Sequence, residues 1–133
     1  MQTPASSGPG PDGPAGVEAP INVAVDRVSD GVVVLGVTGE VDLLTASVLG
    51  ERLREQLDSA SRVLVLDLSS VSFLGSAGLA EIVSASQAGT DRGARVLLVA
   101  TGRAVLRPLE VTGLLSLFTV YDTVESALAS VER

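Results

Sequence analysis

The 133-residue sequence has a formal net charge of −7 and contains no cysteine, histidine or lysine, so all nine basic residues are arginine. These absences exclude disulfides, the Ser-His-Asp triad, the lysine of a P-loop and the usual zinc ligands, so we expect neither an enzyme nor a bound cofactor or metal. The excess of acidic residues argues against binding to nucleic acids or to anionic membranes. It favours a protein partner with a basic face, although an acidic surface also promotes solubility.

Residues 1–20 hold five of the six prolines and four glycines. Such a segment can bury little apolar surface, and we expect a disordered Pro/Gly-rich tail ahead of a folded domain over residues 21–133. The first residues lack the basic and apolar regions of a secretory signal. No run of about 18 apolar residues is present, so we expect a cytoplasmic protein without membrane insertion.

The first elements of the domain form a hairpin followed by a helix. Apolar and polar residues alternate over residues 21–25, as in a half-exposed strand. The turn signal Ser-Asp-Gly at residues 29–31 leads into a second strand over residues 32–37. Apolar residues then recur at helical spacing between Thr45 and Ser59, and they predict one amphipathic helix.

Strands and helices alternate over the rest of the chain. Residues 62–68 and 95–99 are nearly continuous apolar runs, typical of strands that are covered on both faces. A helix is predicted from Ser76 to about Gly89, and another through residues 105–110 that ends at Gly113. A short strand follows over residues 117–121, and residues 122–125 resemble a capping box that opens the last helix.

This order of elements predicts an α/β fold. Parallel strands joined by helical crossovers, after an initial hairpin, give a mixed and mostly parallel β-sheet. Because the first strand alternates polar and apolar residues, we expect about four helices to lie mainly on one face of the sheet.

Three segments together resemble the STAS domain, the family of sulfate transporters and anti-sigma factor antagonists. They are residues 37–42 (VTGEVD), residues 66–79 (LDLSSVSFLGSAGL) and residues 107–114 (RPLEVTGL). The resemblance extends over roughly residues 21–131. It implies a STAS-like sheet and a regulatory binding module that acts as an anti-anti-sigma factor.

The family usually reads Asp-Ser-Ser/Thr-Gly-Leu at the start of its second helix, and its second hydroxyl residue is the phospho-acceptor. A partner anti-sigma factor, a kinase of the histidine-kinase-like ATPase type, phosphorylates that residue. In this chain the acceptor position is Ala77, which has no oxygen to modify. The resemblance implies a partner-binding surface of Glu40, Asp42, Gly75, Ser76, Ala77, Gly78 and Leu79.

Several of these residues also have a purely structural interpretation. Ser76 is either a surrogate phosphosite or, as we favour, the N-cap of its helix. Asp42 either faces the partner or caps the first helix, and the two roles are compatible. We expect Gly39 to serve backbone geometry, Phe73 to lie in the core, and Arg103 and Arg107 to be solvated charges.

The favoured function is therefore that of a protein that sequesters a kinase-type anti-sigma factor and is not switched at Ala77. The alternative is a STAS subunit of a lipid-trafficking ABC transporter, or a scaffold of a sensory complex. Nucleotide binding at the helix start is a weaker option. A homodimer is a further possibility that the sequence does not decide.

Overall fold

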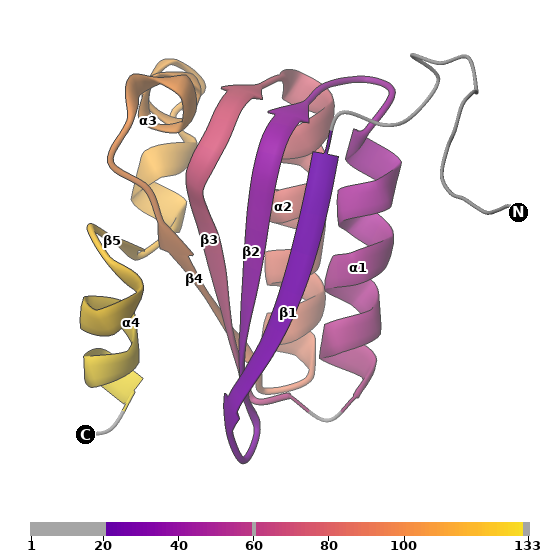
Figure 1. The fold of residues 1–133 in the computed structure, drawn as a ribbon, viewed down its shortest axis with the longest axis vertical. Helices are drawn as coiled ribbons and strands as arrows, with labels where there is room; N and C mark the ends of the chain where they lie inside the picture. Colours follow the sequence, from indigo (N-terminus) through magenta and orange to yellow (C-terminus); the bar gives the residue numbers. More distant parts are fainter. Residues whose placement is uncertain (1–20, 60, 132–133) are drawn as a thin grey trace, which may run out of the picture.

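The computed structural model describes residues 21–59 and 61–131, so the expected tail over residues 1–20 lies outside the described residues. Five strands and four helices follow one another with one short 3₁₀ helix between them (Figure 1). In chain order they are β1 (Ile21–Ser29), β2 (Val32–Val41), α1 (Ala46–Asp58), β3 (Val63–Leu74), α2 (Ser76–Asp91), β4 (Arg95–Val99), α3 (Arg103–Val111), η1 (Leu114–Leu117), β5 (Val120–Tyr121) and α4 (Val124–Val131).

The strands form a single sheet in the order β1-β2-β3-β4-β5. β1 runs antiparallel to β2, and β2, β3, β4 and β5 pair in parallel. The β1–β2 connection turns at Gly31, whose φ of 74° is accessible to glycine at little cost. The predicted mixed sheet with an initial hairpin is confirmed.

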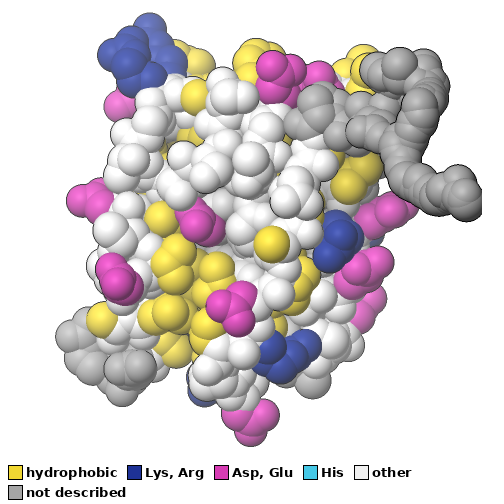
Figure 2. All heavy atoms as spheres, in the orientation of Figure 1, with side chains coloured by type: hydrophobic (Ala, Val, Ile, Leu, Met, Phe, Trp, Pro, Cys, Tyr) yellow, Lys and Arg dark blue, Asp and Glu magenta, His cyan; other side chains and the backbone are white. Residues whose placement is uncertain are grey.

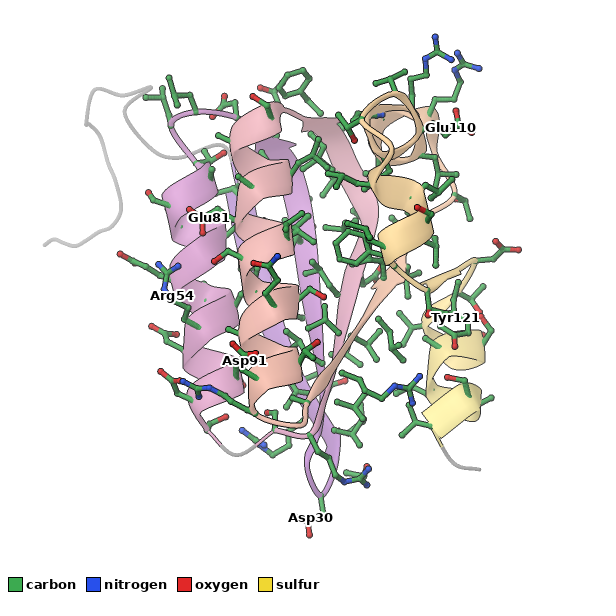
Figure 3. The ribbon with its side chains drawn as sticks, turned by 180° about the vertical axis from the view of Figure 1, so that it is seen from behind. Asp30, Arg54, Glu81, Asp91, Glu110 and Tyr121 are labelled. Carbon is green, nitrogen blue, oxygen red and sulfur yellow. The ribbon has the colours of Figure 1, made fainter. Side chains whose placement is uncertain are left out.

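The helices cover the two faces of the sheet unequally (Figures 1 and 3). α1, α2 and α3 pack on one face, where leucines such as Leu49, Leu66 and Leu109 form the larger core. α4 packs on the other face, where Ala127 is fully buried against valines of β2 and β3. The expectation of helices mainly on one face is confirmed.

Several predicted boundaries were wrong. β2 and β3 are longer than predicted, because Val41, Val71 and Leu74 are buried although polar residues and bulges interrupt the apolar pattern. Leu117 belongs to η1 rather than to the last strand. The last helix is capped one residue later than predicted, since the Thr123 Oγ1 accepts the N–H of Ser126 at 3.0 Å.

Two glycines allow the helices to approach their neighbours closely. A Cβ on Gly78 of α2 would lie 2.5 Å from Val41 Cγ1 and 2.8 Å from Leu74 Cδ1, both buried at the ends of strands. A Cβ on Gly50 of α1 would meet only the carboxylate of Glu81, which reaches over from α2 and lies 3.4 Å from Arg54 (Figure 3). A side chain at position 78 would therefore clash with buried core residues. A side chain at position 50 would meet the flexible side chain of Glu81.

We expect Gly78→Ala to lower the free energy of unfolding by about 1–3 kcal/mol, because the added methyl overpacks the contact of α2 with β2 and β3. Gly50→Ala should change it by less than about 1 kcal/mol, since Glu81 can swing away and alanine favours the helix. Urea denaturation of both variants compares two identical changes on neighbouring helices. Equal losses would contradict the assignment of Gly78 to a packed contact.

Candidate functional site

The parallel strands β2 and β3 end side by side. Val41 and Leu74 are register partners at the last positions of the two strands. The N–H of Gly75 donates to the carbonyl oxygen of Val41 at 2.8 Å, which joins the start of α2 to the end of β2. The predicted site residues before α1 and at the start of α2 are thus brought to one surface, which lies at the top of Figure 1.

The start of α2 differs from the predicted N-cap. Gly75 is the N-cap, Ser76 is the first helical residue, and no side chain caps this helix within the described residues. The expectation that Ser76 is the N-cap was wrong, because glycine with an extended backbone occupies the position where a capping hydroxyl would lie. Ser76 is therefore exposed, and its hydroxyl forms no capping hydrogen bond with the first turn of α2.

The next three residues of α2 are progressively covered. Ala77 is half-buried and packs against the larger core. Gly78 and Leu79 are buried and hold the helix against the strand ends. Of the predicted partner-binding residues in this segment, Ser76 is thus the exposed one, and the others position it.

A small hydrogen-bond network shapes the loop between β2 and α1. The Oδ1 of Asp42 accepts the backbone N–H groups of Leu44 at 3.0 Å and Thr45 at 3.1 Å. The Thr45 hydroxyl is fully buried, accepts the N–H of Asp42 at 2.9 Å and lies 2.8 Å from the carbonyl oxygen of Glu40. The bonds donated to its carboxylate, led by that from the Thr45 N–H, lower the pKa of Asp42 from its usual value near 3.8. Asp42 therefore stabilises the turn before α1, and Thr45 is the N-cap residue.

Glu40 lies at the end of β2, exposed and opposite Phe73 of β3 in the register of the sheet. The preceding Gly39 has a φ of 113° at a register shift between the two strands. The expectation that Gly39 serves backbone geometry is confirmed. The extra residue at this register shift lies in β3, between Val71 and Phe73, so the end of β3 is the bulged one.

Three exposed apolar residues surround this site. Leu43 and Leu44 in the loop before α1 are 84% and 82% exposed. Phe73 is 50% exposed, so the expectation that it lies in the core was wrong, because the bulged end of β3 presents it to the surface. We call the surface formed by Glu40, Leu43, Leu44, Phe73 and Ser76 the carboxyl edge.

The leucines of the carboxyl edge were missed by the sequence analysis. The helical apolar pattern begins at Ala46 and leaves Leu43 and Leu44 outside it. Two adjacent leucines between a strand and a helix, with no place in either pattern, were the signal that could have identified them.

α3 borders the carboxyl edge. Ser76 of α2 lines a groove of about 420 Å³ together with Thr112 and Leu114, which follow α3. Arg103 and Arg107 are exposed on α3, as predicted, and form no ion pair with any described residue. Figure 2 shows dark-blue side chains over α3 at the upper left, with yellow and magenta side chains farther along the top.

Other kinds of site find little support in the described residues. Within the described ranges, acidic side chains do not gather in threes as a metal ion would require. The carboxylate of Asp67 accepts the N–H and the hydroxyl of Ser69 at 3.0 and 2.7 Å, which is a structural role. Each helix in the part of the chain that the structure describes is too short or too polar to cross a membrane.

Comparisons with known proteins agree on one family. A family model for the STAS domain matches residues 24–127. The anti-sigma-F factor antagonist RsfB of Mycobacterium tuberculosis is 38% identical over 117 residues, which are 86% of this chain and 94% of RsfB. A crystal structure of an anti-sigma factor antagonist from Mycobacterium paratuberculosis has a TM-score of 0.75 and 35% identity, over 85% of this chain and 95% of that one.

The fold extends to more distant proteins. The anti-sigma factor antagonist SpoIIAA in its unphosphorylated form has a TM-score of 0.72 over 84% of this chain and 96% of its own. Its identity is 18%, so the likeness shows the fold alone.

We expect Thr45→Val to lower the free energy of unfolding by about 1–3 kcal/mol, because valine keeps the shape and leaves the Asp42 N–H and the Glu40 carbonyl without their buried partner. Thr45→Ser keeps the hydroxyl and should lose less than about 1 kcal/mol. Chemical denaturation measures both. A serine variant as unstable as the valine variant would show that the methyl group, not the hydrogen bonds, holds this loop.

Proposed function

The chain belongs to the STAS domain family, and from this premise we propose that it is an anti-sigma factor antagonist that binds its partner through the carboxyl edge. The partner is an anti-sigma factor of the histidine-kinase-like ATPase type, as the resemblance in the motifs implies. By occupying that factor, the chain releases a sigma factor. The function is one of binding, without a reaction catalysed by this chain.

The single observation that carries the proposal is the exposed apolar surface beside the start of α2. Leu43, Leu44 and Phe73 are exposed around Ser76, at the segment that matches the family's switch motif. Exposed apolar side chains gathered at one place are typical of protein interfaces. Charged residues at the rim, such as Glu40, favour orientation of the partner.

Ala77 makes the binding state permanent in this proposal. Phosphorylation adds about −1.5 to −2 charges at pH 7, enough to repel an acidic partner surface and to disturb an apolar contact. Ala77 offers no hydroxyl, and its half-buried methyl packs against the core. The chain therefore stays in the form that binds the anti-sigma factor, whatever the activity of the kinase.

We expect affinity capture on this chain, from a lysate of its source organism, to recover a histidine-kinase-like anti-sigma factor identified by mass spectrometry. Leu44→Asp should reduce its recovery at least about tenfold, because it places a charge in the apolar contact. Leu117→Asp is the matched control, since this leucine is 64% exposed on η1 and lies beside the other end of α2. Recovery of a transporter ATPase instead, or equal losses for both variants, would contradict the proposal.

We expect the purified chain to take up no phosphate within residues 75–79 when incubated with the recovered kinase and ATP. Ala77→Ser restores the hydroxyl, and this variant should be phosphorylated and then bind the kinase at least about tenfold more weakly. Phosphopeptide mapping and titration calorimetry measure the two effects. Phosphate on Ser76 of the unchanged chain would overturn the permanent binding state, and Ser76→Ala identifies that outcome.

A further inference from the structure

The carboxyl edge and the outer face of α3 together carry opposite charges on the two sides of an apolar centre. Phe73 lies at the end of β3, and Glu40 is on the neighbouring strand β2. On the other side of β3, after β4, lies α3 with Arg103 and Arg107 (Figure 1). The order across the surface is therefore basic, apolar and acidic.

The charges at both ends have no partner within the described residues. Glu40 forms no ion pair or hydrogen bond through its side chain, and the same holds for Arg103 and Arg107. Glu110 also lies on the exposed side of α3 (Figure 3), so two arginines face one carboxylate and the end stays basic. Arg103 and Arg107 thus form a local basic group on a chain whose net charge is −7.

Apolar side chains accompany the charges at both ends. The exposed Leu43 and Leu44 follow Glu40 in the loop after β2. Val111 is 65% exposed and lies on α3 together with the arginines. A two-fold axis through such a surface places the α3 end of one copy against the Glu40 end of the other. Arginine then meets glutamate, and Val111 meets leucine, twice in each pair of copies.

We propose that this surface binds a second copy of the chain, in a symmetric dimer centred on Phe73. Charge complementarity selects this occupant, because an isologous contact requires a patch that is complementary to itself. Repulsion between two chains of net charge −7 opposes the association, so the dimer is weak. Its dissociation constant lies between about 10 μM and 1 mM, as for small transient interfaces.

The dimer regulates the binding surface, and this second step rests on the proposed function. The contact covers Leu44, Phe73 and Ser76, so a dimer cannot bind an anti-sigma factor there. Self-association then replaces phosphorylation as the process that prevents the chain from binding the anti-sigma factor. As the total concentration of the chain rises, a smaller fraction of it is free to bind the factor.

Sedimentation equilibrium from about 10 μM to 1 mM measures the dissociation constant of the dimer, for the unchanged chain and for three charge variants. Glu40→Arg and Arg107→Glu should each weaken the dimer about tenfold or more, because each reversal acts at two symmetric contacts. The double variant Glu40→Arg/Arg107→Glu exchanges the charges, keeps the net charge at −7, and should return to within about threefold of the unchanged chain.

Net charge alone predicts a different order. Glu40→Arg makes the chain less negative and would then strengthen association, whereas Arg107→Glu would weaken it. Arg27→Glu is the matched control, since Arg27 is exposed on β1 near the hairpin turn, at the opposite end of the β1–β2 pair from Glu40, and should leave the dimer within about threefold.

A chain that is monomeric at 1 mM, variants that follow net charge, or a double variant that does not recover would each overturn the dimer. The anti-sigma factor is absent from this measurement, so the two proposals fail separately. A dimer without any binding of the factor would overturn the proposed function and leave the self-association standing.

Discussion

The attachment of α2 to the ends of β2 and β3 is the constraint on which the rest of the site depends. The Gly75 N–H donates a hydrogen bond to the Val41 carbonyl. Because Gly78 has no side chain, Val41 and Leu74 can pack directly against the backbone of α2. With the helix fixed in this way, Ser76 must be exposed and Ala77 must be half-buried. Any larger residue at position 78 would move the helix start away from the strands that carry Glu40 and Phe73.

The loop before α1 depends on the same strand ends. Because β2 continues to Val41, the buried Thr45 hydroxyl can reach the Glu40 carbonyl and the Asp42 N–H. The polar groups of the loop are thereby satisfied internally, and Leu43 and Leu44 are the side chains that remain on its outside. The surface at this end of the STAS domain is therefore apolar, with the exposed charge of Glu40 at its border.

In the proposed function, Ala77 occupies the phospho-acceptor position without a hydroxyl, and this changes what can regulate such a surface. A phosphoserine acts by adding charge at one helix start. Here the fixed charges lie farther apart, on β2 and α3, and their arrangement is set by the order of the strands. Regulation by charge would then depend on which molecule binds the surface, rather than on a covalent modification of it. The same residues that orient one partner can exclude another.

Apolar periodicity and motif spacing are local properties. The order of elements, the mixed sheet, the family and the lack of a hydroxyl at position 77 could therefore be predicted from the sequence. It did not determine the ends of β2 and β3, where bulges break the alternation, and so it placed Phe73 in the core and passed over Leu43 and Leu44. A serine before a helix usually caps it, but here Gly75 occupies the N-cap position and Ser76 is the first helical residue. These features required the folded structure, since exposure at a strand end depends on which distant segments cover it.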